Sequence, residues 1–191
     1  MLKRLLFVIS LTLISTLAYA QQQTAIFAVG CFWCGQSDFD KVPGVIQTIA
    51  GFDGGRAPNP SYKQVSSGTT NYVESVKVIY DSKKVSYQQL LDYFWHHIDP
   101  TVKDAQFCDH GRQYQSVIFY LNPAQQQQAL ASSRAVKKQF PVVYTEINPS
   151  TRFYPAEEYH QDYYKKNPWR YEFYRWNCGR DTRLKEVWDG K

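Results

Sequence analysis

The sequence lacks the charge pattern of a nucleic-acid-binding protein and the periodicity of a repeat protein. Its 22 Lys and Arg residues are interspersed with 17 Asp and Glu residues, which leaves a net charge of +5. No basic stripe stands out along the chain, so we expect no nucleic-acid partner. The one biased stretch is a run of glutamines at 125–128, and no segment repeats. The length suits a single domain with a hydrophobic core.

The chain also lacks an apolar run of the usual membrane-spanning length, which is about 20 residues. The apolar run at 5–17 follows Lys3 and Arg4 and precedes the small residues Ala18 and Ala20. A positive start, a short apolar stretch and a small-x-small site are typical of a cleaved secretory signal. A single-span anchor is the alternative interpretation. We therefore expect a cleaved signal peptide over 1–20, one domain over 21–191, and an exported protein that is periplasmic or secreted.

Cysteine is scarce, with four residues at positions 31, 34, 108 and 178. An even number of cysteines in an exported protein first suggests two structural disulfides. A domain of this size does not need such cross-links, so redox chemistry is the competing interpretation. A zinc site would need a second closely spaced pair of ligands. Cys108 and Cys178 are each isolated in the sequence, and we expect no bound metal.

Aromatic residues, in contrast, are abundant: 15 Tyr, 11 Phe and 5 Trp. Most of them need no explanation beyond core packing, and a minority are candidates for an apolar pocket. Short strands and helices alternate along the chain, and the hairpin-like segment 45–80 argues against a purely parallel sheet. The pattern predicts an α+β fold, a two-layer sandwich of the ferredoxin-like (split βαβ) type. The closely spaced Pro, Gly and aromatic residues after Asn167 predict an irregular C-terminal tail.

The boundaries of the expected elements follow from apolar periodicity, caps and prolines. Residues 61–70 and 101–115 are expected to be irregular, and Arg180, Arg183 and Lys185 to form a solvated face. The expected strands cover 25–29, 45–49, 72–80, 117–121 and 142–147, and the expected helices cover 32–41, the segment after Ser86, 123–139 and the segment after Pro155.

Cys31 is the first candidate for chemistry, because it follows an apolar strand and begins a helix. A helix N-terminus carries a partial positive charge and unpaired N–H groups, which favour the thiolate and lower the pKa of a cysteine. The alternative is a small buried apolar residue. Cys34 completes a C-x-x-C spacing, which is also the redox motif of thioredoxin-like proteins. The bulky Phe32 and Trp33 between the two cysteines suit the wall of an apolar pocket better than a disulfide-docking loop.

These residues carry a family resemblance. Gly30-Cys31-Phe32-Trp33 is similar to the G-C-F-W signature of peptide methionine sulfoxide reductase A, in an exported form. The similarity covers nearly the whole chain after residue 20, in order. It continues through Gly51-Phe52-Asp53-Gly54-Gly55, Asn59-Pro60-Ser61-Tyr62, Ser67-Gly68-Thr69, Val73-Glu74-Ser75-Val76, Phe94-Trp95, Asp99-Pro100-Thr101, Asp109-His110-Gly111-Arg112-Gln113-Tyr114 and Cys178-Gly179-Arg180. Gln36, Phe52 and Tyr72 depart from the common pattern of the family.

The resemblance implies reduction of methionine S-sulfoxide, free or in proteins, to methionine, and hence repair of oxidised proteins. It assigns Cys31 as the nucleophile and Phe32 and Trp33 as the cage of the substrate methyl group. Glu74, Tyr62 and Tyr114 would hold the sulfoxide oxygen, and Asp109 would support the site. Burial on an apolar strand face would keep Glu74 protonated, so that it could act as a general acid.

Attack by Cys31 would leave it as a sulfenic acid, which a second thiol must resolve into an intramolecular disulfide. The resemblance assigns Cys178 as this resolving cysteine. Cys34 is the alternative, and Cys108 lies next to Asp109, so that either could resolve the sulfenic acid or relay electrons. We expect no bound cofactor, a thioredoxin-like donor of reducing equivalents, and a monomer. The competing functions are a secreted binding module with all cysteines in disulfides, and a general disulfide oxidoreductase that uses Cys31 and Cys34.

Overall fold

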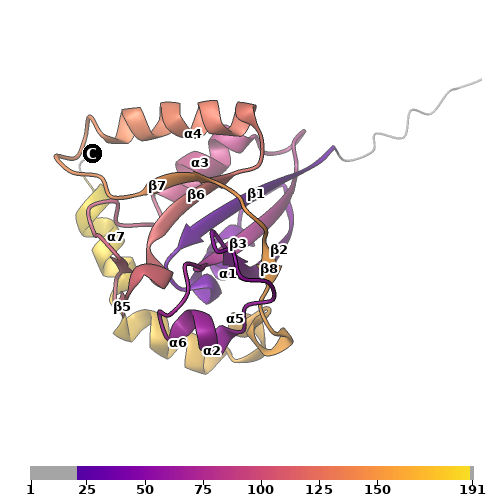
Figure 1. Cartoon of the computed structure of the whole chain (residues 1–191). Coiled ribbons are helices and arrows are strands. Elements are labelled where there is room, and N and C mark those ends of the chain that lie inside the picture. The colour runs from indigo at the N-terminus through magenta and orange to yellow at the C-terminus, as the bar shows by residue number, and fades with distance from the viewer. Residues whose placement is uncertain (1–20, 190–191) are drawn as a thin grey trace, which may run out of the picture.

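The computed structural model describes residues 21–189, so the expected signal peptide over 1–20 lies outside the described residues. A six-stranded sheet in the order β7-β6-β1-β3-β2-β8 forms the centre of the molecule (Figure 1). The strands are β1 (Gln22–Val29), β2 (Val45–Asp53), β3 (Val73–Asp81), β6 (Ser116–Tyr120), β7 (Glu146–Pro149) and β8 (Tyr154–Pro155). All neighbours are antiparallel except β6 and β7, which are parallel. The fold is α+β with a central mixed sheet.

The main core lies between this sheet and the helices α1 (Phe32–Phe39) and α3 (Tyr87–Trp95). Phe27 on β1 stacks on Phe39 of α1 at 5.0 Å and on Phe94 of α3 at 5.3 Å between ring centroids. All three rings are fully buried, and burying one such side chain contributes about 3 kcal/mol. Helix α4 (Pro123–Val136) packs next to α3, and Trp95 Nε1 donates to Ser132 Oγ across that contact at 3.0 Å.

Most of the strands and helices expected from the sequence are present in the structure. Ser86 caps α3 as expected, and its hydroxyl accepts from the backbone N–H of Gln89 in a complete capping box. Ser61 caps α2 (Tyr62–Ser66) in the same way, although residues 61–70 were expected to be irregular. That prediction was wrong because a helix of five residues is too short to show apolar periodicity.

Residues 101–115 were likewise expected to form an irregular loop, and the structure corrects this too. They contain a short hairpin of β4 (Ala105–Gln106) and β5 (Asp109–His110), followed by a 3₁₀ turn at Arg112–Tyr114. Two-residue strands show no alternation in sequence. Strand β7 also begins later than the expected residue 142, at Glu146.

The C-terminal region is helical, and the predicted irregular tail is wrong. Helices α6 (Pro168–Asn177) and α7 (Arg180–Trp188) follow the short α5 (Tyr163–Lys166). Pro168 opens α6, where its missing N–H costs nothing. Gly179 separates α6 from α7 with φ of 66°, a conformation that favours glycine. The helix expected after Pro155 was also wrong, because Pro155 belongs to β8 and a 3₁₀ turn at Glu158–His160 precedes α5.

The outer edge of β2 pairs with β8 over two residues only, at Gly51 and Phe52. Next to them, the side-chain amide of Gln161 accepts from Ala50 N at 2.9 Å and donates to Ala50 O at 2.8 Å. The Gln161 amide therefore makes the same pair of hydrogen bonds to the Ala50 backbone that a neighbouring strand would make. Gln36 of α1 donates to the carbonyl oxygen of Thr48 at 3.2 Å along the same edge.

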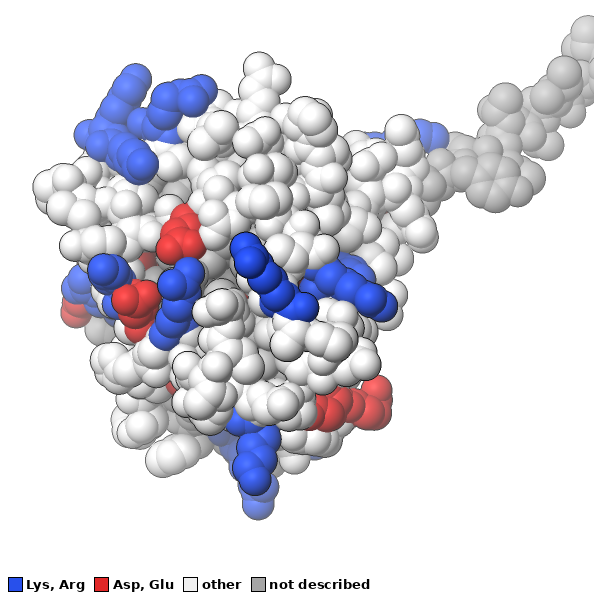
Figure 2. Space-filling view, viewed as in Figure 1, with Lys and Arg blue, Asp and Glu red and all other residues white. Residues whose placement is uncertain are grey.

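Charged side chains are scattered over the molecular surface. On the face shown in Figure 2, Lys and Arg side chains lie among acidic and uncharged ones. Across residues 21–189, no helix combines the length and the apolar character that a membrane crossing requires.

Candidate active site

Cys31 lies where β1 gives way to α1, as the sequence predicts, and is the N-cap residue of that helix. Gly30 makes the turn with φ of 85°, and a Cβ at that position would approach Gln106 Cβ to 2.6 Å. Only glycine fits this turn without displacing its neighbour. The turn leaves Cys31 7% exposed, at the wall of a cavity.

This cavity, of about 120 Å³, is small and mixed in character. It brings together seven of the residues proposed from the sequence, which come from β1–α1, α2, β3 and the segment 109–114. One further residue, Tyr174, belongs to α6. The lining consists of Cys31, Phe32, Trp33, Tyr62, Glu74, Asp109, Tyr114 and Tyr174. The remaining three proposed residues, Cys34, Cys108 and Cys178, are outside this lining.

Glu74 is the buried acid of the cavity. It projects from β3, is 2% exposed, and its Oε2 accepts from the backbone N–H of Phe32 at 3.0 Å. Burial raises the pKa of Glu74 to about 8, and the charge of Asp109 adds to the rise, whereas the Phe32 N–H opposes it. Glu74 is therefore mostly protonated at neutral pH and can donate a proton.

The two sulfurs of Cys31 and Cys34 share a hydrogen bond inside the protein. Burial is the largest cause that raises the pKa of Cys31, and the contact with Cys34 adds to it. The pKa of Cys34 is lowered, chiefly because it accepts this hydrogen bond. The prediction of a lowered pKa for Cys31 considered the helix N-terminus alone and missed the burial of the sulfur. The more acidic thiol of the pair is Cys34.

Arg180 supplies positive charge behind Cys34 and lowers its pKa further. It is 2% exposed, and its guanidinium donates to Val29 O at 3.1 Å and to His97 O at 2.7 Å. A third contact, at 3.4 Å, joins it to Asp38. The expected solvated face is therefore wrong for Arg180, since its side chain fills the space between α1 and the end of α3.

Three tyrosine hydroxyls can donate hydrogen bonds in or beside the cavity. Burial raises the pKa of Tyr62 to about 12 and also raises that of Tyr114, so both stay neutral donors. Tyr174 was not singled out from the sequence; its hydroxyl donates to Asp109 Oδ2 at 2.5 Å. Burial raises the pKa of Asp109, and this hydrogen bond opposes the rise. Nothing local distinguished Tyr174 from the other tyrosines.

Trp33 is held in place by two contacts. Its Nε1 donates to His160 Nδ1 at 3.1 Å, and its ring stacks on Tyr163 at 3.9 Å between centroids. His160 is 1% exposed and lies between the rings of Trp33 and Tyr62. His160 therefore supports the wall of the cavity.

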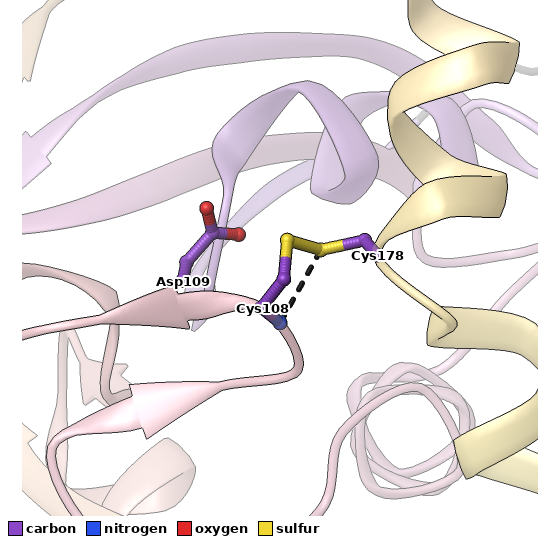
Figure 3. A group of neighbouring side chains, drawn as sticks. All are labelled: Cys108, Asp109 and Cys178. Carbon is purple, nitrogen blue, oxygen red and sulfur yellow. Dashed lines mark hydrogen bonds between the residues drawn. A yellow bond between two sulfur atoms is a disulfide. The ribbon is translucent and has the colours of Figure 1, made fainter.

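The second pair of cysteines is a disulfide between Cys108 and Cys178 (Figure 3). The backbone N–H of Cys108 also donates to Cys178 Sγ at 3.3 Å. The resemblance implied a bond from Cys178 to Cys31, but in this structure Cys31 and Cys34 are both free. Asp109 has a ligand atom within 4.8 Å of both bonded sulfurs. Sulfurs joined to each other are not thiolates and do not offer the ligands that zinc prefers.

Comparison with known proteins is consistent with this geometry. The family model described as peptide methionine sulfoxide reductase matches residues 23–191. The chain is 46% identical over 172 residues to the peptide methionine sulfoxide reductase MsrA/MsrB of Vibrio cholerae, covering 88% of this chain but 45% of that longer protein. It is 44% identical over 176 residues to MsrA 2 of Caulobacter vibrioides, covering 91% of this chain and 89% of the relative.

Solved structures agree with the sequence comparison. Methionine sulfoxide reductase A of Corynebacterium diphtheriae superposes with a TM-score of 0.72 at 35% identity, covering 77% of this chain and 76% of that one. Mxr1 of Saccharomyces cerevisiae in complex with Trx2 is similar in fold, with a TM-score of 0.55 at 21% identity over 76% of this chain and 86% of that one. The family match spans the described chain and includes every residue of the cavity. The chain therefore belongs to the peptide methionine sulfoxide reductase family.

Proposed function

We propose that this enzyme reduces the S-sulfoxide of methionine, free or in proteins, and that Cys31 and Cys34 carry out the two thiol steps. Reduction of methionine sulfoxide by an oxidoreductase is the activity of the family to which the chain belongs. The observation that carries the more detailed proposal is the hydrogen-bonded pair of free cysteines beside a buried, protonated carboxyl group. Each of the two sulfoxide epimers has its own reductase, and the A-type enzymes of this family reduce the S-epimer.

In the first step, Cys31 sulfur attacks the sulfoxide sulfur. Its proton passes to the thiolate form of Cys34, the hydrogen-bond acceptor, as the new bond forms. Glu74 donates a proton to the sulfoxide oxygen, and the hydroxyls of Tyr62 and Tyr114 stabilise the charge that develops there. Phe32 and Trp33 enclose the methyl group. The oxygen then moves from the methionine sulfur to Cys31 as the transient sulfur–sulfur bond breaks, so that methionine leaves and Cys31 becomes a sulfenic acid.

In the second step, Cys34 sulfur attacks the sulfenic acid and a Cys31–Cys34 disulfide forms. The oxygen leaves as water with the proton that Glu74 delivered and the proton that Cys34 took from Cys31. The two thiols lose two electrons and the sulfoxide gains them, so the reaction balances without a bound cofactor. Cys34 needs no large movement because it already contacts Cys31, whereas Cys178 would first have to leave Cys108.

A thioredoxin-like dithiol donor would reduce the disulfide again. The solved complex of yeast Mxr1 with Trx2 supports this kind of partner. A general disulfide oxidoreductase is a weaker candidate, because thiol–disulfide exchange has no oxygen to protonate and so gives no role to the buried Glu74 beside Cys31.

The finer description of the protein belongs to the same proposal. The order β6-β1-β3-β2, with β3 antiparallel between β1 and β2, supports a ferredoxin-like split βαβ sandwich. The sequence pattern over 1–20 supports a cleaved signal and an exported protein. The monomer expected from the sequence belongs to the same proposal. N-terminal sequencing and size-exclusion chromatography of the protein from an expressing cell would test both.

Reduction of dabsyl-methionine sulfoxide, resolved into its two epimers, tests the function directly. With dithiothreitol as reductant, wild type should consume the S-epimer and leave the R-epimer. The matched variants are Cys31→Ser and Glu74→Gln. Equal rates in wild type and Cys31→Ser would contradict the proposal.

A further inference from the structure

Helix α6 exposes three large aromatic side chains in a row. Trp169, Phe173 and Trp176 are spaced four and three residues apart, so they lie on one face of the helix. Their side chains are 83%, 64% and 76% exposed. Phe173 and Trp176 also contact each other, with ring centroids 6.1 Å apart. We call these three residues the α6 stripe.

The opposite face of α6 makes the contacts that hold the helix on the protein. Tyr171 is buried beside Cys34, and Tyr174 reaches Asp109. The α6 stripe is therefore not needed to anchor the helix. Contiguous exposed aromatic surface is uncommon on monomeric proteins and marks sites of interaction, and Trp in particular is enriched where binding energy concentrates.

The helix that carries the α6 stripe also forms part of the catalytic cavity, because Tyr174, on the face opposite the stripe, belongs to the wall of that cavity. The cavity of about 120 Å³ equals the volume of about four liquid water molecules. It has room for the end of one side chain. The remainder of any polypeptide that presents a methionine sulfoxide must lie on the surface around the opening, and α6 forms part of that surface.

We propose that the α6 stripe binds apolar segments of oxidised polypeptides and so directs the enzyme to methionine sulfoxide in unfolded, hydrophobic stretches of chain. This inference rests on the proposed function. Methionine is an apolar residue, so a segment in which it became oxidised after unfolding carries apolar neighbours that water solvates poorly. Aromatic rings on a rigid helix can cover such neighbours without recognising a particular sequence.

Charge argues against an anionic membrane as the partner of this face. Lys165 and Lys166 of α5 and Arg175 of α6 each form an ion pair with an acid of this chain. Arg170 is exposed, and the acid Glu172 lies two positions further along the same helix. Helices that lie on anionic lipids instead present an excess of Lys and Arg beside their apolar face.

Two synthetic peptides of equal length test the proposal, each with one central methionine S-sulfoxide. One has Leu, Val and Phe around the sulfoxide, and the other has Ser, Gly and Thr. The variant Trp169→Gln/Phe173→Gln/Trp176→Gln keeps good helix formers on α6. The matched control, Val142→Ser/Tyr144→Ser, removes exposed apolar side chains (47% and 46% exposed) from the segment before β7.

With dithiothreitol as reductant, wild type and control should reduce the apolar peptide with a kcat/KM at least about tenfold above that of the polar peptide. The stripe variant should lose this preference while reducing free methionine sulfoxide at the wild-type rate. A preference that survives in the stripe variant would overturn the proposal. So would an equal loss on free sulfoxide, which would indicate a structural role.

Two other outcomes would assign the stripe to a different partner and also overturn the proposal. One is a defect that appears only when thioredoxin replaces dithiothreitol, and the other is loss of binding to phosphatidylglycerol vesicles without any effect on the peptides. Fluorescence anisotropy of the apolar peptide, labelled and carrying unoxidised methionine, measures binding without catalysis. Wild type should bind it at least about tenfold more tightly than the stripe variant does, even if reduction of free sulfoxide, and with it the proposed function, were to fail.

Discussion

The two cysteine pairs of this molecule differ in almost every physical respect. Cys31 and Cys34 are buried, reduced and hydrogen-bonded to each other at the start of one helix. Cys108 and Cys178 are joined, more exposed, and separated by 70 residues in sequence. Cys31 of the first pair lines a cavity with an acid and two tyrosine donors, and the second pair ties the β4–β5 hairpin to the end of α6. Under the proposed function, enclosure and a neighbouring proton donor, more than exposure, distinguish the reactive pair.

The largest effect expected from this comparison is that of Cys31→Ser. A serine hydroxyl at this position is a far weaker nucleophile than a thiol, so kcat for methionine sulfoxide should fall by a factor of about 10³ or more. The steady-state rate with dithiothreitol measures this. Retained activity would mean that another cysteine attacks the substrate.

The variants Cys34→Ser and Cys178→Ser test which of the two cysteine pairs supplies the resolving thiol. Without reductant, each variant should still form one equivalent of methionine, because Cys31 is intact. With thioredoxin, Cys34→Ser should turn over about a hundredfold more slowly, since its sulfenic acid has no neighbouring thiol. Mass spectrometry after dimedone treatment should find the adduct on Cys31 in Cys34→Ser only. The reverse pattern would make Cys178 the resolving cysteine.

Glu74→Gln sharpens the role of the proton donor beside the buried pair. Loss of a general acid should lower kcat by about 10²- to 10³-fold. In wild type the protonated form of Glu74 is present below its raised pKa of about 8, so kcat should decline as pH rises through 8. Glu74→Gln should lack this decline, and a pH–rate profile from pH 6 to 9.5 measures both.

The same pKa also predicts a stability change. Folded Glu74 binds a proton that the unfolded chain has already released above a pH of about 4.5, so the free energy of unfolding should fall between pH 4.5 and 8. Glu74→Gln should show a shallower fall in urea titrations across that range. A steeper fall would contradict the assigned protonation.

Tyr62→Phe and Tyr114→Phe remove one neutral donor each and leave the rings in place. Each variant should lose about 10²-fold in kcat if its hydroxyl stabilises the developing charge. Tyr144→Phe, altered at an exposed ring, serves as the control. Wild-type kcat in both test variants would leave Glu74 as the sole donor to the oxygen.

The smallest expected effect on activity belongs to the exposed pair. Cys108→Ser/Cys178→Ser should keep reduction by dithiothreitol within about threefold, because the Tyr174–Asp109 hydrogen bond still joins α6 to the hairpin. Its free energy of unfolding should drop by about 2–4 kcal/mol, the usual contribution of a disulfide. Urea denaturation without reductant measures this, and a large loss of activity would show that the exposed pair takes part in turnover.

The parts of the fold that the sequence predicted are those with a strong local signal. Apolar runs and alternation located β1, β2, β3 and β6, and Ser86 located the start of α3. The C-terminal helix α6 was not predicted from the sequence, because its apolar residues are divided between the buried Tyr171 and the exposed α6 stripe. No single apolar face indicated a helix there.

For the candidate site too, the sequence predicted only the residues with a strong local signal. Cys31, Phe32, Trp33 and Glu74 could be predicted because each stands beside a recognisable strand or helix end. The disulfide partner of Cys178 could not be predicted, because the position of Cys108 depends on a hairpin of two-residue strands. The sequence also could not predict which of Cys31 and Cys34 has the lower pKa. That order depends on burial and on Arg180, which lies near the two cysteines only in the folded protein.

The glutamine at the edge of the sheet has a consequence for the protein in concentrated solution. A free strand edge offers N–H and C=O groups to which a second chain can add, and such addition begins aggregation. At Ala50 both groups are already bonded to the amide of Gln161. The side chain of Gln161, in a segment with no regular structure of its own, thus shields that point of the β2 edge from another molecule, together with the backbone N–H of Ala156, which donates to the same carbonyl oxygen.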